Sequence, residues 1–147
     1  MKIRESLNFF LDLKGNTTEK SEIKVYNKFI GILTALESRN LTMPQLTSIE
    51  EALDNLALQA KTDDPKKHFN KKLTEFKDFL RVEHSLISEG YFMGYGMLFG
   101  LLAGTIFQYY YGVYSVIAGI IAGMAIGAIM DSKAQKQGRV LKIRITE

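Results

Sequence analysis

The most restrictive feature of this sequence is a run of 41 residues, Gly90 to Met130, that contains no charged side chain. A helix on the surface of a soluble protein needs a polar face, and none can be drawn on this run. Nine of the chain's twelve glycines also lie in it. A buried hairpin of a soluble protein is the alternative, but the lack of any charge favours a membrane segment.

The length of the run predicts two membrane spans. A spanning helix needs about 20 mostly apolar residues to cross roughly 30 Å of hydrocarbon. The sequence Gln108-Tyr109-Tyr110-Tyr111-Gly112 offers the natural break. We therefore expect spans at about 91–107 and 113–130, joined by a turn at 108–112. Tyr109, Tyr110 and Tyr111 suit the headgroup level, because the ring is apolar and the hydroxyl is wet.

The flanking charges predict the orientation of this hairpin. The turn contains no Lys or Arg, whereas five basic residues follow the second span within residues 131–147. Positive residues near a span stay on the cytoplasmic side. We thus expect a bacterial inner-membrane protein with both termini in the cytoplasm. Lys133, Lys136 and Arg139 would then lie at the inner membrane interface.

Small residues recur at every fourth position on both expected spans. They are Gly96, Gly100 and Gly104 on the first, and Ser115, Gly119, Gly123 and Gly127 on the second. Residues four apart share a helix face, so each set forms a groove that lets another helix approach closely. The two grooves could face each other in a monomeric hairpin, or one could face a neighbouring subunit. We expect a homo-oligomer, because both spans also carry bulky faces.

The segment "GYGMLFGLLAGTIFQYYYGVYSVIAGIIAGMAIGAIMDSKAQKQGR" resembles the glycine-zipper double-span proteins of bacteria. In those proteins two GxxxGxxxG helices are followed by a short charged exit of the form D-x-K-A-x-x-x-G-R. The likeness covers roughly the last third of the chain. It implies close packing of two membrane helices, and the families that share the motif include channels.

Residues 1–89 have a different composition, with 14 basic and 14 acidic residues. Helix-start signals stand at the capping box Thr42-Met43-Pro44-Gln45 and at Asp64-Pro65. A further helix should begin after Thr18, following a first amphipathic segment that ends at KGNTTE. We expect a cytoplasmic bundle of about four helices. Its last helix should run to about Ser88, with its apolar side chains turned inward: Phe69, Leu73, Phe76 and Leu80.

The tail at 131–147 should first continue the second span as a helix, with Gly138 as its C-cap. Leu141, Ile143 and Ile145 then alternate with polar residues, which is typical of a strand. A lone strand needs a partner for its backbone groups. The N-terminal sequence MKIR or a neighbouring subunit's tail could serve, and a disordered or lipid-skimming tail is an equal alternative. The expected fold is therefore all-α: head at 1–89, hairpin at 90–130 and basic tail.

The sequence offers little chemistry for catalysis. It contains no cysteine and only two histidines, and no phosphate-binding loop, nucleophile motif or metal-ligand cluster. We expect no enzyme, no cofactor, no metal and no nucleic-acid partner. Two functions remain. The hairpins could assemble into a pore, with Thr105, Gln108 and Ser115 as candidates to line it. Alternatively, the hairpin is a non-conducting anchor or scaffold, and the head binds a cytosolic protein.

Overall fold

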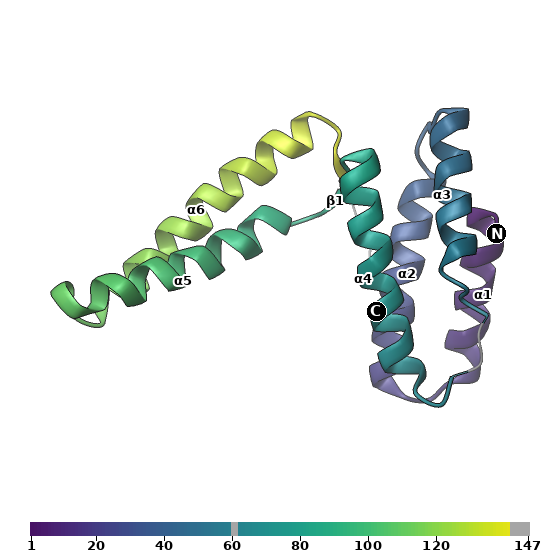
Figure 1. Ribbon diagram of the computed structural model, residues 1–147, viewed down its shortest axis with the longest axis horizontal. Coiled ribbons are helices and arrows are strands. Elements are labelled where there is room, and N and C mark those ends of the chain that lie inside the picture. The colour runs from purple at the N-terminus through teal and green to yellow at the C-terminus, as the bar shows by residue number, and fades with distance from the viewer. Residues whose placement is uncertain (60–61, 142–147) are drawn as a thin grey trace. The chain divides into compact units, whose positions relative to one another are not determined.

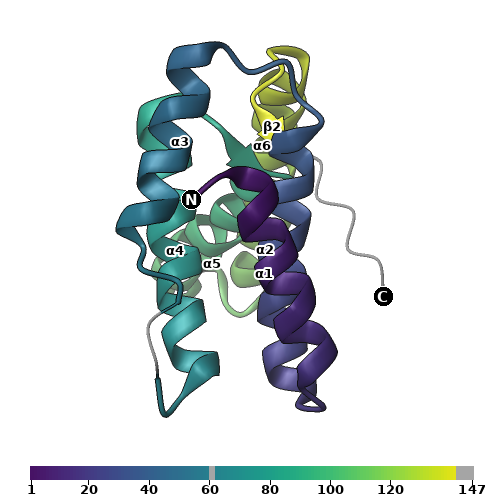
Figure 2. The same cartoon turned by 90° about the vertical axis from the view of Figure 1, so that its right-hand side faces the viewer.

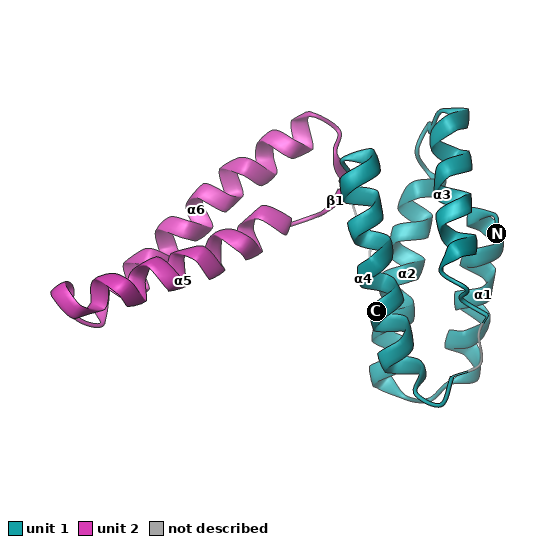
Figure 3. Ribbon diagram, in the orientation of Figure 1, with its two compact units in different colours: residues 1–86, 141–147 teal, residues 87–140 magenta. Residues whose placement is uncertain are grey.

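A computed structural model describes residues 1–59 and 62–141 of the chain. This part of the chain is mainly helical (Figure 1). Its elements are α1 (Ile3–Asn16), α2 (Lys20–Glu37), α3 (Met43–Asn55), α4 (Pro65–His84), β1 (Ile87–Ser88), α5 (Tyr91–Tyr111), α6 (Tyr114–Lys136) and β2 (Val140–Leu141). They form two compact units, coloured in Figure 3. The first holds Met1–Leu86 and Leu141, and the second holds Ile87–Val140.

The first unit is a bundle of the four helices α1 to α4, which lie side by side in Figures 1 and 2. Its core is rich in aromatic rings. Phe10 stacks on Phe29 with ring centroids 4.2 Å apart, and Phe69 meets Phe10 edge-on at 5.5 Å. The side chains that were predicted to turn inward from the last helix are all buried: Phe69, Leu73, Phe76 and Leu80.

Both predicted helix-start signals of the head are confirmed. The backbone N–H of Thr42 donates to the side-chain oxygen of Gln45 at 3.1 Å, which is half of the capping box that starts α3. The carboxylate of Asp64 accepts from the backbone N–H of Lys67 at 3.0 Å and caps α4. Each helix also carries a proline in its first turn, where the missing N–H needs no partner.

The predicted end of the last head helix, near Ser88, is wrong. α4 ends at His84, and Ser85 adopts a left-handed backbone conformation with φ of 53°. The backbone N–H of Leu86 then bonds back to the carbonyl of Leu80 at 2.9 Å. The helix ends here for a packing reason. Leu86 is buried in the core of the head, whereas Ile87 belongs to a separate small core in the second unit.

Two described residues of the tail, Val140 and Leu141, form a short strand, but its partner differs from those predicted. β2 pairs with β1, a strand that the sequence analysis did not foresee. The backbone N–H of Ile87 donates to the carbonyl of Arg139 at 3.0 Å. Gly138 was predicted as the C-cap of α6, but the C-cap is Gln137, and Gly138 follows it with a φ of 68°. Ile143 and Ile145 of the predicted strand lie outside the described residues.

The turn of the hairpin is shorter than predicted. α5 continues through the three tyrosines to Tyr111, and α6 begins at Tyr114. Gly112 and Val113 alone connect them. Gly112 has a φ of 70°, a conformation that side chains rarely adopt, and its backbone N–H bonds to the carbonyl of Gln108 at 2.9 Å. The glycine thus decides where the chain reverses.

Candidate functional site: an apolar helical hairpin

The surface of the hairpin is apolar on all sides. Among the described residues, all but three of the large hydrophobic side chains that are exposed lie on α5, α6 or their turn; the three in the head are Leu11, Met43 and Val82. The exposed set on the hairpin includes Leu98, Phe99, Leu102, Ile106, Phe107, Ile117, Ile121, Ile126 and Ile129. Exposed apolar patches of this extent mark a surface that another medium or molecule covers.

One helix among the described residues, α6, is long and apolar enough to cross a membrane by length and composition. Its 23 residues measure about 34 Å at 1.5 Å per residue. Only 11% of its most apolar stretch is buried, which separates it from the core helix of a soluble protein. α5 falls short of the same criterion, because tyrosine, glycine and glutamine lower its mean hydropathy. By this criterion one of the two predicted spans qualifies, and the predicted two-span hairpin is not supported.

The glycines of α5 and α6 lie against each other along the hairpin. A Cβ atom added to Gly100 would collide with the carbonyl oxygen of Gly119, and one added to Gly123 would collide with that of Gly96. A Cβ at Gly104 would lie 2.6 Å from the Cα of Val116. The backbones are therefore in direct contact. We call this contact the glycine seam: Gly96, Gly100, Gly104, Gly119, Gly123 and Gly127.

The seam uses both predicted grooves at once. This is the monomeric arrangement of the two that the sequence left open, because each glycine face packs against the other helix of the same chain. The expectation of a homo-oligomer therefore has to rest on the outer faces of the hairpin, where the side chains are bulky.

The tip of the hairpin holds the three residues considered for a pore lining. The hydroxyl of Ser115 lies 3.0 Å from the carbonyl oxygen of Gly104 and 2.7 Å from that of Gly112. The hydroxyl of Thr105 donates to the carbonyl of Leu102 within its own helix at 2.7 Å. Gln108 is exposed in the last turns of α5. Thr105 and Gln108 are thus exposed three residues apart on α5, whereas Ser115 lies against carbonyl groups within the hairpin.

Four tyrosines surround this tip. Tyr109, Tyr110, Tyr111 and Tyr114 expose between 74% and 89% of their surface. Rings that are this open, beside a turn without charge, suit the boundary between hydrocarbon and water.

At the base of the hairpin, a carboxylate joins the two helices. The two oxygens of Asp131 accept from the backbone N–H groups of Phe92 at 3.0 Å and Met93 at 2.9 Å. The residue before α5 is Gly90, which has no side chain to cap the helix. Asp131 near the end of α6 therefore satisfies two free donors at the start of α5, and its charge is favourable at that positive helix end.

The base also holds a small core and the basic residues. Ile87, Ala134 and Val140 are buried together, and Tyr91 and Phe92 pack against them. Lys133 and Lys136 are exposed in the last turn of α6, where cations favour the helix dipole. Arg139 is half-buried, and its guanidinium donates to the side-chain oxygen of Gln137 at 3.3 Å. Charge is thus confined to the base, and the tip carries tyrosines instead.

Sequence reasoning missed Asp131 as a functional residue of the hairpin. One signal could have found it: Gly90 opens a helix without a capping side chain, and Asp131 is the first charge after the apolar run. Two helices of similar length in a tight hairpin bring those two positions to the same end.

No protein-family model, curated protein or solved structure matches this chain. Within residues 1–59 and 62–141, no group of three or more His, Cys, Asp or Glu side chains is placed to hold a metal ion. The physical character of the hairpin therefore carries the functional argument.

Proposed function

We propose that this protein is a membrane-anchored helical domain, in which the α5–α6 hairpin crosses the bilayer and the four-helix head works at the cytoplasmic surface. The observation that carries the proposal is the apolar surface around the whole hairpin, with charge only at its base. Burying this surface in lipid gains roughly 25 cal/mol for each Å² of apolar area removed from water.

The glycine seam gives the reason why both helices cross together. α6 has the length and composition of a span, and α5 is packed against it from Gly127 at the base to Ser115 at the tip. If α6 enters the bilayer, α5 must follow or the seam must open. α5 contains no charged residue that opposes this. Its hydroxyl at Thr105 is bonded to its own backbone, as hydrocarbon surroundings require.

The geometry supports an anchor better than a pore. A pore needs polar groups aligned along one outer face of the hairpin, and Ser115 instead lies against carbonyl groups inside the hairpin. A pore built from several copies also needs a close contact between subunits, and the small residues suited to it already pack within one chain. In the anchor, the hairpin holds the head beside the membrane, where the head meets a cytosolic protein.

Membrane fractionation tests the anchor. The full chain should stay with the membrane pellet after washing at alkaline pH with carbonate, which strips peripheral proteins. A variant with Asp and Lys replacing Ile117 and Ile121, both more than half exposed on α6, should lose this retention. The matched control places the same two charges at exposed head positions, Leu11 and Val82, and should stay in the pellet. Release of the unmodified chain by carbonate would contradict the proposal.

The same preparation separates anchor from pore. Purified protein in liposomes that hold a potassium gradient should leave the leak rate at that of empty liposomes. A leak that rises with the amount of protein would favour the pore and overturn the anchor.

A further inference from the structure

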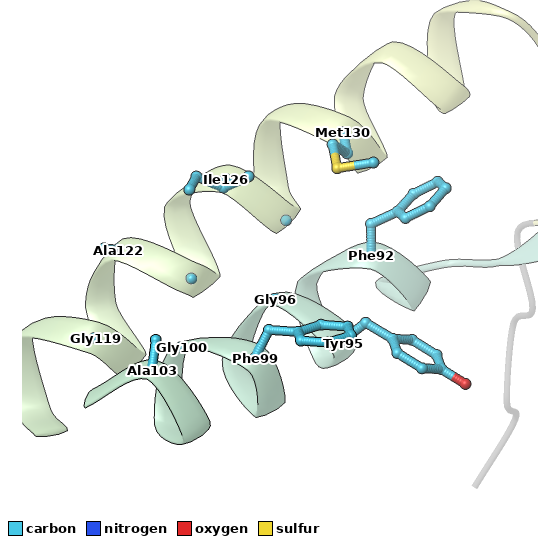
Figure 4. A pocket seen from close by; sticks show the side chains of 12 residues that line it. Phe92, Tyr95, Gly96, Phe99, Gly100, Ala103, Gly119, Ala122, Ile126 and Met130 are labelled. Carbon is cyan, nitrogen blue, oxygen red and sulfur yellow. The ribbon is translucent and has the colours of Figure 1, made fainter. Parts of the chain in front are cut away.

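One face of the hairpin is hollowed beside the glycine seam. The groove has a volume of about 430 Å³, and its floor is the backbone of the seam glycines. Phe92 and Phe99 of α5 form one wall, and Ile126 and Met130 of α6 form the other (Figure 4). All of the lining residues apart from Tyr95 have apolar or no side chains. The groove suits a chain of methylene groups.

The groove has the length of one bilayer leaflet. It runs along α6 from Gly119, in the second turn from the tip, to Met130 near the base. These eleven steps span about 16 Å at 1.5 Å per residue, and half of a hydrocarbon core of roughly 30 Å is about 15 Å. If the hairpin spans the membrane, the groove therefore extends from the bilayer centre to the cytoplasmic headgroups.

A positive charge stands at the headgroup end. Lys133 lies three residues after Met130 and seven after Ile126, so it shares the helix side that faces the groove. Lys133 is exposed and makes no salt bridge within the described part of the chain. The neighbouring carboxylate of Asp131 is turned to the N–H groups of Phe92 and Met93. Lys136 lies six residues after Met130 and ten after Ile126, spacings that do not place it on the helix side of the groove.

We propose that this groove binds one acyl chain of an anionic phospholipid from the cytoplasmic leaflet, with the lipid phosphate against the ammonium group of Lys133. The inference rests on the proposed membrane insertion. The positive charge of Lys133 favours an anionic lipid. The apolar walls of the groove and its length, which matches one leaflet, favour an acyl chain as the group bound. A second copy of the hairpin is the competing occupant, but it would have to fit a whole helix between the aromatic wall of α5 and the aliphatic wall of α6.

Tryptophan quenching by brominated lipids tests the inference. The chain has no tryptophan, so a single introduced indole reports alone. Phe99→Trp places it in the groove wall, and Ile126→Trp is a second groove position. The matched control is Leu98→Trp, which lies at the same depth, is 52% exposed and does not line the groove. Each variant enters vesicles of mixed phosphatidylcholine and phosphatidylglycerol, with bromine on the chains of one lipid or the other.

We expect brominated phosphatidylglycerol to quench the groove tryptophans more strongly than brominated phosphatidylcholine at equal lipid fractions. The local enrichment should be about fivefold, because that ratio corresponds to the attraction of one near-surface lysine for an anionic lipid. Leu98→Trp should show no preference. Lys133→Gln should remove the preference at the groove positions, and Lys136→Gln should leave it.

The other outcomes each overturn a definite statement. Equal quenching by both lipids at every position would overturn the anionic-lipid site while leaving the hairpin inserted. Quenching at Leu98→Trp together with shielding of both groove tryptophans would show a second copy in the groove. A preference that survives Lys133→Gln would overturn the role of that lysine. No quenching by either lipid at any position would overturn the membrane insertion itself.

Discussion

At the level of single residues, two features hold the hairpin together. The seam glycines have no side chains to separate the helices, and the carboxylate of Asp131 caps α5 at the base. Gly100 and Gly123 have no room for a Cβ, whereas Gly94 on the same α5 helix has nothing within 4 Å of one. Asp131 meets two backbone donors at the start of α5, where the N-cap residue Gly90 has no side chain to cap them. Both features concern contacts across the hairpin rather than along one helix.

Alanine substitution in the seam should loosen the hairpin. Alanine favours a helix over glycine by about 1 kcal/mol, so any loss has to come from the collision with the opposite backbone. We expect Gly100→Ala to cost about 1–3 kcal/mol through forced separation of the helices. Protease resistance of the detergent-solubilised protein measures it. Gly94→Ala is the control and should be neutral or stabilising, so equal behaviour of the two variants would contradict the seam.

Removing the carboxylate at the base should free the start of α5. Asp131→Ala leaves the N–H groups of Phe92 and Met93 without their acceptor, at a cost of about 0.5–2 kcal/mol for a lost helix cap. Faster hydrogen exchange of a peptide that covers residues 91–97 should report it. Ser132→Ala alters an exposed neighbour and should leave that exchange unchanged. An Asp131→Ala variant with unchanged exchange would show that the cap is dispensable.

At the level of elements, the end of α4 and the two short strands connect regions that are distant in sequence. Leu86 and Leu141 are both buried in the core of the head, although 54 residues separate them, and β2 pairs with β1. A head fragment that ends at Ser88 therefore lacks one of its own core side chains.

The head should depend on this returning leucine. Leu141 is only 2% exposed, and truncation of a buried leucine to alanine typically costs 2–5 kcal/mol. We expect Leu141→Ala in the full chain to accelerate hydrogen exchange in α2 and α4 peptides. Val82→Ala changes a side chain that is 70% exposed and should cost less than about 0.5 kcal/mol. Identical exchange in the two variants would remove Leu141 from the core.

For the whole molecule, the distribution of charge sets the expected orientation in a membrane. Lys133 and Lys136 stand at the base of the hairpin, whereas the tip presents tyrosines and no charge. Moving the tip across hydrocarbon therefore transfers no ionised group, and moving the base would transfer several.

Cysteine labelling should find position 110 outside and position 135 inside. The chain has no cysteine of its own, so Tyr110→Cys and Gln135→Cys can be labelled one at a time without background. Both positions are exposed in the structure. An impermeant thiol reagent applied to intact cells should label the first variant, and the second only after the cells are opened. The reverse pattern would invert the proposed topology.

The sequence by itself determined features that depend on neighbouring residues or on composition. The starts of α3 and α4 follow from side chains and prolines within one helical turn, and Gly138 follows the C-cap of α6 for a similar local reason. The apolar character of α6 is likewise a sum over its residues. The glycine spacing indicated close helix contacts, but it left open whether they lie within one chain.

Only the tertiary structure decided which of these features meet. Three contacts depend on how distant segments are aligned. They are the pairing of the two glycine faces, the capping of α5 by a residue 38 to 39 positions away, and the burial of Leu141 in the head. The local sequence does not indicate such contacts, because the short-range conformational preferences of an aspartate or a leucine are the same whichever distant residue it contacts. Folding selects among them by steric fit: the two backbones approach this closely because a glycine stands on at least one side of each seam contact.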